Sequence, residues 1–533
     1  MKTKKFSIAL KGILCVFLLC FPLLAEQKAK TQVFNPREKF AVKELKDDFR
    51  LLRTALEEGH GGLYRYTPKQ ELDQQFETIL GKLTQPLTAK EFLLRLAPLI
   101  ANINDGHTGL ILSSPHVNYL KKQPIFFPFK LKFIKKGGGT PNPFTVSQMP
   151  FFRSFISKVC RKNKVSLGIS KKRAYLFRNY SEHTNLVMGG EVISINGQPI
   201  STIIEKMLPI LSSDGHIESS KYRRLESSSY FSRTYTILFG RTREYSIVYQ
   251  PPGTKDVKTI KSKGLTQDQL NAEFEKRYPE AAKDKPPIEL EYKGNIPVLT
   301  VRTFGGGYKK AGISYPEFIK NAFTQFHEKN IKNLVIDLRG NGGGRDEYGK
   351  ILFAYLIDSP FQYYKHLEVK QNKHSFWPYT NVPEGEKELA ASIKKNNRGT
   401  YDVDVSKHPN LGIQQPLKPT FKGNVFILID GRSFSATGEC TSLIHFYKKA
   451  RFVGEECGAG YYGNTSGFMV LLTLPNTRLR IRIPMVKYAM AVSGYPPDRG
   501  IIPDYPVVPK MSDLLNGRDT EMEFVLKLIK EKL

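Results

Sequence analysis

Apolar residues near the start of the chain recur at the spacing of an amphipathic helix. Val42, Leu45, Phe49, Leu52 and Leu56 follow one another at three- and four-residue intervals, which places them on one helix face. Polar and charged residues occupy the positions between them. The pattern predicts a helix with one buried side in this region.

A second helix is predicted from Thr88. Its hydroxyl can cap the first turn, and Glu91 three residues later completes a capping box. Phe92, Leu96 and Leu99 continue the apolar face. We therefore expect a helical region before residue 104.

The pattern then changes from helical to β-rich. Residues 104–108 read Asn-Asp-Gly-His-Thr, a turn signal directly before the apolar run Leu110–Leu112. Short β-type runs such as Phe126–Phe133 follow, and Gly189–Gln198 predicts a strand closed by an Asn-Gly turn. The middle of the chain is thus predicted to be built mainly of strands.

Beyond the charged, proline-bearing stretch Pro279–Pro287, which we interpret as a linker, strands alternate with helices. Leu334–Leu338 and Val425–Ile429 have the continuous apolar character of buried strands. One helix face is made by Ile319, Ala322, Phe323 and Phe326. Such alternation predicts an α/β core with parallel strands.

The first residues resemble a secretory signal peptide. Four lysines precede the apolar run Gly12–Leu24, which ends at Ala25, a small residue suited to cleavage. The run is short for a membrane span, although an uncleaved N-terminal anchor is an alternative interpretation. We expect export, to the periplasm or the exterior. The predicted divisions are a signal peptide at 1–25, a helical region at 26–115, a β-rich segment at 116–285 and an α/β domain at 286–533.

Composition narrows the function classes. Of the 533 residues 40% are hydrophobic and 25% charged, which is typical of a globular protein. The formal net charge of +31 favours acidic partners, and for an exported protein it fits an anionic envelope surface. The basic residues are dispersed and form no recognised motif with aromatic residues, so no specific nucleic-acid partner is predicted. Ten scattered histidines without a His-Glu-x-x-His motif indicate no metal site, and no cofactor is expected.

Two strand ends carry the candidate chemistry. Asp337–Gly344 (DLRGNGGG) lets backbone N–H groups approach a ligand, but it lacks the Lys-Ser/Thr of a phosphate-binding loop. In the segment Asp430–Gly438 (DGRSFSATG), Ser435 stands where a strand turns into a helix. Its hydroxyl would lie at the carboxyl edge of the sheet, and the N–H of Ala436 would face a developing oxyanion. A plain glycine turn and a helix-capping serine are the alternative interpretations.

Together these segments resemble the S41 family of serine peptidases, which includes the tail-specific or C-terminal processing proteases and the tricorn-like proteases. The matching segments, in order, are 333–344, 431–439, 451–467 and 499–504, with weaker matches at 105–108 and 189–197. The resemblance implies a ClpP/crotonase-like α/β core and peptidase activity on polypeptides. It also implies that Ser435 is the nucleophile. The oxyanion donors would be the N–H groups of Ala436 and of a glycine in 342–344, of which we select Gly343.

The resemblance leaves two choices for the general base. The tail-specific branch uses a lysine after its Gly-Glu-x-x-Gly turn, but residues 459–463 contain none, and Lys487 lies farther along the chain. The tricorn-like branch uses a histidine from an earlier segment, and His107 occupies that place. We therefore predict His107 as the base, with His60 as a rival and a structural histidine as the alternative interpretation.

The acid that orients the histidine sits, in the family, just before a Gly-Ile-x-Pro-Asp motif. Asp498 is the nearest carboxylate here, although an Asp498–Arg499 surface turn is an equal interpretation. Glu439 is interpreted as a supporting acid near the helix start. The predicted catalytic set is therefore Ser435, His107 and Asp498.

These observations predict an exported serine endopeptidase that forms an acyl-enzyme on Ser435. The strand at Gly189–Gly197 resembles part of a PDZ-like domain that would hold the carboxyl terminus of a substrate, with a plain β-rich insert as the alternative. Because the lysine base is missing, the rival function is a catalytically inactive S41-fold protein that binds peptides or apolar ligands.

Overall fold

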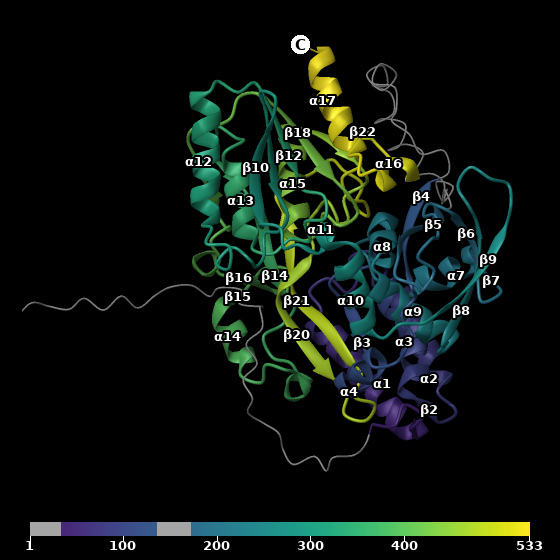
Figure 1. The fold of residues 1–533 in the computed structure, drawn as a ribbon. Coiled ribbons are helices and arrows are strands. Elements are labelled where there is room, and N and C mark those ends of the chain that lie inside the picture. Colours follow the sequence, from purple (N-terminus) through teal and green to yellow (C-terminus); the bar gives the residue numbers. More distant parts are fainter. Residues whose placement is uncertain (1–33, 136–171, 533) are drawn as a thin grey trace, which may run out of the picture.

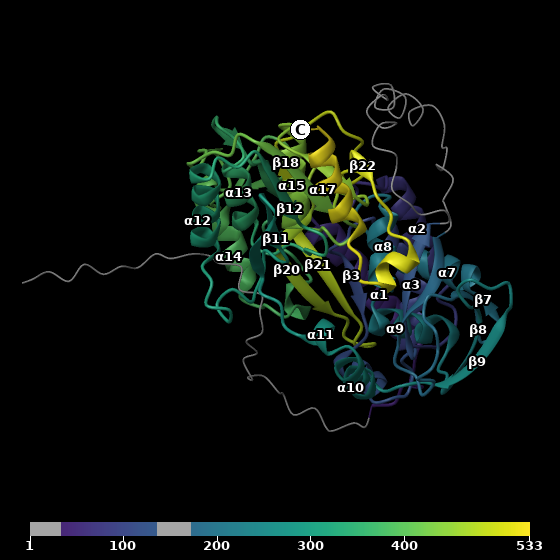
Figure 2. The same cartoon turned by 45° about the horizontal axis from the view of Figure 1, so that its top comes forward.

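The computed structural model describes residues 34–135 and 172–532 (Figure 1). The predicted signal peptide lies outside the described residues. Within the described ranges, no helix combines the length and the apolar character needed to cross a bilayer. The chain forms mixed helices and sheets, as predicted, and Figure 2 shows the same arrangement from a second direction.

Three helices form the N-terminal region: α1 (Val42–Gly59), α2 (Lys69–Gly81) and α3 (Ala89–Asn102). The predicted capping box opens α3, because the Glu91 amide donates to Thr88 Oγ1 at 3.2 Å and the Thr88 amide donates to the Glu91 carboxylate at 2.8 Å. The apolar face of α1 is buried in the same core as the helices of the C-terminal half. The N-terminal helices are therefore packed onto the α/β domain.

A six-stranded sheet forms the centre of the C-terminal half. Its order is β10 (Ile288–Lys293), β11 (Ile296–Val301), β12 (Asn333–Asp337), β18 (Asn424–Ile429), β19 (Arg451–Gly454) and β22 (Tyr505–Pro506). The strands from β11 to β22 are parallel, and β10 pairs antiparallel at the edge. The predicted buried strands are thus adjacent, β12 beside β18, so their carboxyl ends meet at one edge.

Helices cover both faces of this sheet. Val335 and Leu428 pack in one core with α17 (Thr520–Lys532), while Leu334 and Ile336 belong to the larger core. The larger core contains residues of α12 (Tyr315–Glu328), α13 (Asp346–Ala354) and α15 (Ala436–Phe446). Burial on both faces explains why the strands read as continuous apolar runs.

In a second sheet, a strand of the N-terminal region pairs with a strand of the C-terminal half. Its order is β15 (Ile393–Lys395), β16 (Tyr401–Val403), β14 (Tyr364–Val369), β21 (Arg480–Met490) and β20 (Thr465–Thr473), and β3 (Gly109–Ile111) pairs with β21. In that pairing Gly109 lies opposite Arg482. The turn at 104–108, which directly precedes β3, is therefore held against the α/β domain.

The middle segment forms an antiparallel sheet with its own core, seen beside the C-terminal half in Figures 1 and 2. Its order is β4 (Phe129–Lys135), β5 (Lys172–Asn179), β6 (Glu191–Ile195), β8 (Glu244–Gln250) and β9 (Lys258–Lys263), with β7 (Gln198–Pro199) beside β6. The predicted Asn196-Gly197 turn has positive φ angles of 50° and 74°. The sheet packs with α7 (Ile200–Met207), α8 (Glu218–Leu225) and α9 (Ser228–Phe239).

The stretch Pro279–Pro287, which we interpreted as a linker, begins as the short helix α11. Other short elements, together with α11, complete the described part of the structure. They are β1 (Lys39–Phe40), β2 (Leu87–Thr88), α4 (Ser114–Lys121), η1 (Leu208–Ile210), α10 (Gln267–Arg277), α11 (Pro279–Ala282), β13 (Phe361–Gln362), η2 (Trp377–Tyr379), α14 (Gly385–Ser392), η3 (Val405–Lys407), β17 (Ile413–Gln414) and α16 (Met511–Leu515).

Candidate active site

Ser435 occupies a strained turn between β18 and α15. Its backbone has φ 57° and ψ −129°, a conformation that residues with a side chain rarely adopt. The Asp430 carboxylate stabilises this turn by accepting the amides of Arg432 at 2.9 Å and Ser433 at 3.1 Å. The same oxygen accepts the Gly340 amide of the glycine turn at 2.9 Å. One carboxylate therefore fixes both strand-end turns relative to each other.

The glycine turn packs directly against the serine. Gly343 has φ +91°, and a Cβ on it would lie 2.7 Å from the Cβ of Ser435. Its N–H donates to Asn341 Oδ1 at 3.0 Å, so the amide that we predicted as an oxyanion donor is already engaged within the protein, contrary to the prediction. Within the described residues, the amides of Ala436, Gly342 and Gly344 have no acceptor.

His107 reaches the serine from the turn before β3. Its Nε2 lies 3.1 Å from Ser435 Oγ, and its ring stacks on Phe434 with centroids 4.6 Å apart. The Arg482 side chain donates to the His107 carbonyl. Burial lowers the pKa of His107 to about 4, against the opposing effect of the Asp105 charge. A neutral imidazole beside the hydroxyl can accept its proton.

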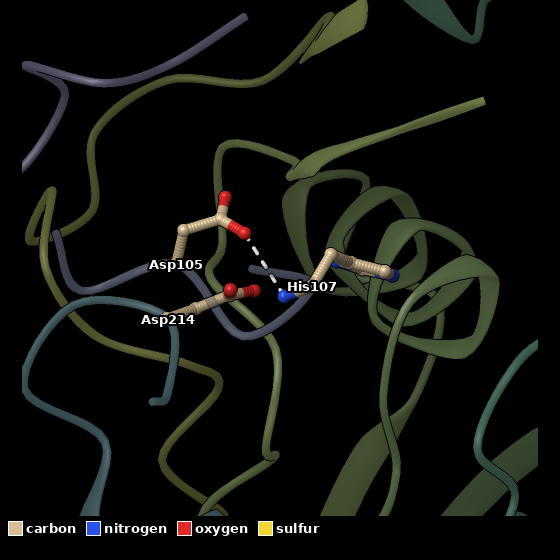
Figure 3. A group of neighbouring side chains, drawn as sticks. All are labelled: Asp105, His107 and Asp214. Carbon is tan, nitrogen blue, oxygen red and sulfur yellow. Dashed lines mark hydrogen bonds between the residues drawn. The ribbon is translucent and has the colours of Figure 1, made fainter. Parts of the chain in front are cut away.

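Two buried aspartates stand behind His107 (Figure 3). A ring nitrogen of His107 and one carboxylate oxygen each of Asp105 and Asp214 lie within 4.8 Å of one another. Asp105 accepts the amides of His107 at 2.9 Å and Thr108 at 2.8 Å, and Asp214 accepts that of Gly106 at 2.7 Å. His107 Nδ1 is buried and has no hydrogen-bond partner among the described residues.

The two carboxyl groups differ in their proton affinity. Burial would raise the pKa of Asp105, but the neighbouring His60 and His107 and the hydroxyls of Thr465 and Thr108 outweigh it and lower that pKa. Burial, together with the charge of Asp105, raises the pKa of Asp214 to about 6. Both carboxyl groups are therefore mainly ionised at neutral pH, and Asp105 keeps its negative charge to lower pH than Asp214 does.

The model of peptidase family S41 matches residues 295–507. These residues belong to peptidase family S41. The chain is accordingly a serine-type peptidase, a hydrolase whose substrates are polypeptides. The S41 domain contains both strand-end turns and Ser435, whereas His107 and Asp214 come from outside it.

Solved structures resemble the whole chain in fold. Mature CPAF is 16% identical with a TM-score of 0.56, covering 92% of this chain and 97% of that one. Mature CPAF complexed with lactacystin is 15% identical with a TM-score of 0.55, covering 91% and 97%. A photosystem II D1 C-terminal processing protease is 12% identical with a TM-score of 0.38, covering 87% and 93%. A search of curated proteins gave no match. At these identities the likeness establishes the fold, the ClpP-like α/β arrangement of S41 proteases.

Asp498, the predicted third catalytic residue, does not lie beside His107. Its carboxylate accepts from His216 Nδ1 at 2.8 Å, and its carbonyl accepts the His216 amide at 2.9 Å. The carboxylate that we predicted as the triad acid therefore stabilises the loop that carries Asp214, and it reaches His107 only through that loop. Sequence reasoning missed Asp214, although Asp-Gly-His occurs at both 105–107 and 214–216 and could have drawn attention to it.

The rival bases are engaged elsewhere. His60 Nδ1 accepts the Gly62 amide at 3.0 Å, so its Nε2 donates to Thr108 Oγ1 at 2.7 Å, and that hydroxyl donates to Asp105. His60 thus supports Asp105. Lys487 Nζ lies 3.5 Å from the Glu368 carboxylate on the neighbouring strand. Neither group is hydrogen-bonded to Ser435.

Glu439 lies in the first turn of α15 and is buried. One of its carboxyl oxygens lies 2.6 Å from the Tyr364 hydroxyl oxygen, and the other accepts from the Asn464 side-chain amide at 2.8 Å. Burial and the nearby Asp346 raise its pKa to about 8, so it is protonated at neutral pH. It supports the helix that follows the serine.

The described residues contain one group of three side chains with the spacing of a metal site: Asp105, His107 and Asp214. Both carboxylates already accept backbone amides, whose positive ends point at the oxygens that a cation would need. These amide donors fit a role of the two carboxylates as acids beside His107 better than a role as ligands of a cation.

Proposed function

We propose that the chain is an exported serine endopeptidase in which Ser435 is the nucleophile and His107 the general base. The observation that carries this proposal is the 3.1 Å contact between His107 Nε2 and Ser435 Oγ at a strained strand-to-helix turn. The histidine at this position supports our placing the chain in the histidine-based, tricorn-like branch of the family rather than in the lysine-based one.

The first half of the reaction forms an acyl-enzyme. Ser435 Oγ bonds to the peptide carbonyl carbon while its proton passes to His107 Nε2. The carbonyl oxygen becomes an oxyanion facing the N–H of Ala436 and the free amides on either side of Gly343. His107 then gives the proton to the leaving nitrogen, and the C–N bond breaks.

The second half releases the product. Water attacks the ester carbon, its proton passes to His107, and the bond to Ser435 Oγ breaks as the oxygen recovers a proton. In both halves an imidazolium forms for a time. We propose that the ionised Asp105, with Asp214 beside it, stabilises this cation in the role first assigned to Asp498.

The proposed location is the periplasm or the exterior. The lysine-rich start, the apolar run to Leu24 and the small Ala25 support export. The net charge of +31, of which the lysines of the predicted signal peptide contribute four, supports contact with an anionic envelope surface once the chain is exported.

Labelling with a fluorophosphonate probe tests the activated serine. The mature protein should be labelled, and Ser435→Ala and His107→Ala should both lose labelling while keeping the wild-type circular dichroism spectrum. Ser442→Ala is the matched control, because Ser442 is a buried serine on the same helix, and it should label normally. Absence of labelling in a folded wild type would favour the non-catalytic binding protein instead. Labelling that survives in His107→Ala would overturn the assigned base.

A further inference from the structure

A cavity of about 460 Å³ lies between the middle sheet and the turn that carries the nucleophile. Its walls come from β4 and β5, from the start of α9, from α10 and from the turn after β18. The cationic lining residues are Lys130, Lys132, Arg178, Arg223 and Arg432, and the acidic ones are Glu226 and Asp430. The cavity is therefore rich in positive charge.

Part of this charge has no carboxylate partner among the described residues. Lys132 and Arg223 form ion pairs with Glu226, at 2.7 Å and 3.2 Å. Lys130, Arg178 and Arg432, in contrast, form no ion pair with any described residue. Three cations without an ion-paired carboxylate thus face one cavity, an arrangement that favours an anion.

Asp430, the other acid of the lining, supplies one negative charge against these three cations. The Asp430 carboxylate already accepts the amides of Gly340, Arg432 and Ser433. Burial, followed by the charges of Arg178 and Lys132, lowers the pKa of Lys130 to about 8. A bound anion would offset the repulsion between Lys130 and these two cations.

The start of helix α9 adds a second anion-binding feature. Ser227, Ser228 and Ser229 line the cavity, and no side chain caps the helix. The amides of Ser228, Ser229 and Tyr230 have no acceptor among the described residues. Free amides at a helix N-terminus attract phosphate-type anions, and here they open into the same cavity as the unpaired cations.

We propose that this cavity binds a phosphate group carried on a small organic body. Lys130, Arg178, Arg432 and the first amides of α9 would hold the phosphate oxygens. Leu270 and Phe274 supply an apolar wall for the rest of the ligand. The volume exceeds the needs of a bare phosphate ion and accommodates a phosphomonoester.

The site joins two parts of the molecule. Arg432 belongs to the turn before Ser435, whereas Lys130 and Arg178 belong to the middle sheet. An anion shared by these side chains ties that sheet to the nucleophile turn. The ligand should therefore raise the melting temperature of the whole protein.

Isothermal titration of the mature protein at constant ionic strength, with inorganic phosphate and with O-phosphoserine, tests the proposal. We expect saturable binding of one O-phosphoserine with a Kd below about 1 mM, tighter than for inorganic phosphate. Lys130→Gln and Arg432→Gln should each weaken it at least about tenfold. Lys261→Gln, an exposed lysine on β9 of the same sheet, should bind as the wild type does.

Each result decides a part of the proposal. Unchanged affinity in Arg432→Gln, whose exposed side chain can be replaced without disturbing the fold, would overturn the site. A melting-temperature rise of equal size with sodium chloride would show general screening and would also overturn it. Equal affinities for inorganic phosphate and O-phosphoserine would overturn the proposal that Leu270 and Phe274 contact the organic part of the ligand. Because binding and melting are read without peptidase turnover, these outcomes are independent of the catalytic proposal.

Discussion

His107 Nε2 and Ser435 Oγ lie 3.1 Å apart although 328 residues separate them along the chain. Two structural features produce this contact. The pairing of β3 with β21 holds the turn that carries His107, and the strained turn between β18 and α15 aims the serine. The pair therefore depends on long-range strand pairing as much as on the residues themselves.

Asp105→Asn tests the acid assignment. The substitution removes the negative charge beside His107 but keeps an oxygen that can accept the His107 and Thr108 amides. Because the imidazolium loses its stabilising charge, kcat/KM should fall by about 10²–10⁴-fold. The rate of peptide cleavage, or of fluorophosphonate inactivation, measures the effect.

Asp498→Asn is the matched control for that experiment, since its carboxylate contacts His216. It should change kcat/KM by less than about fivefold. A large loss in Asp498→Asn with little change in Asp105→Asn would restore the acid predicted from sequence. Circular dichroism of both variants separates lost catalysis from lost folding.

The pH dependence of labelling should reflect the low pKa of His107. The base must be neutral, and a pKa of about 4 means that it is neutral at all higher pH values. The inactivation rate by a fluorophosphonate should therefore rise as the pH passes through about 4 and then level off. A midpoint at or above the ordinary histidine value of about 6.5 would contradict the burial described here.

Glu439→Gln should stabilise the protein at alkaline pH. The pKa of Glu439 is about 8 in the folded state, above its unfolded value, so the folded state binds more protons and stability falls as the pH rises from about 4.5 to 8. A glutamine imitates the protonated carboxyl and can donate to Tyr364, whose hydroxyl donates to Asp346.

For Glu439→Gln we expect a gain of roughly 3 kcal/mol in unfolding free energy at pH 8, shrinking toward pH 4.5. Chemical denaturation at the two pH values measures it. Glu317→Gln, on the exposed part of α12, serves as the control and should be neutral at both. A loss of stability at pH 8 would show that Glu439 is needed in its ionised form.

Neighbouring glycines in the turn provide a matched pair. Gly343→Ala combines φ +91° with a Cβ 2.7 Å from both the Phe434 carbonyl oxygen and the Ser435 Cβ, so it should destabilise by about 2 kcal/mol or more and abolish labelling. Gly342→Ala meets nothing within 4 Å and keeps its amide, so it should label normally. Equal melting temperatures and equal labelling of the two variants would refute the close approach of residue 343 to Phe434 and Ser435.

The proposed export predicts the N-terminus of the mature protein. Cleavage after Ala25 leaves a chain that begins at Glu26. Intact-mass measurement of protein secreted by a host with a general secretion pathway should give that species. Retention of residues 1–25 in the membrane fraction would instead indicate an N-terminal anchor.

The sequence predicted the elements well wherever the pattern was periodic or the cap was local. The α1 face, the Thr88–Glu91 capping box and the buried strands β12 and β18 all follow from neighbours within a few residues. Their apolar patterns also indicated that the strands are parallel, because both faces are covered by helices.

Features that depend on contacts between distant segments were not predictable in the same way. Asp498 stood in the expected stretch of sequence, but the loop at 214–216 lies between it and His107 and takes up its hydrogen bonds. Gly343 lies in the turn that packs against Ser435, yet its amide donates to the Asn341 side chain. Both outcomes depend on side-chain directions of one or two residues, which hydrophobic periodicity does not contain.

The candidate site draws His107 from the N-terminal region, Asp214 from the middle segment and Ser435 from the S41 domain. This three-part origin has a consequence for timing. While the chain is being synthesised, His107 and Asp214 emerge long before the serine exists, so no growing chain shorter than 435 residues can hydrolyse anything by this mechanism. Hydrolytic capacity arises only after the last of the three segments has been made and has folded against the other two. A peptidase assembled in this order cannot cleave its own nascent chain during synthesis.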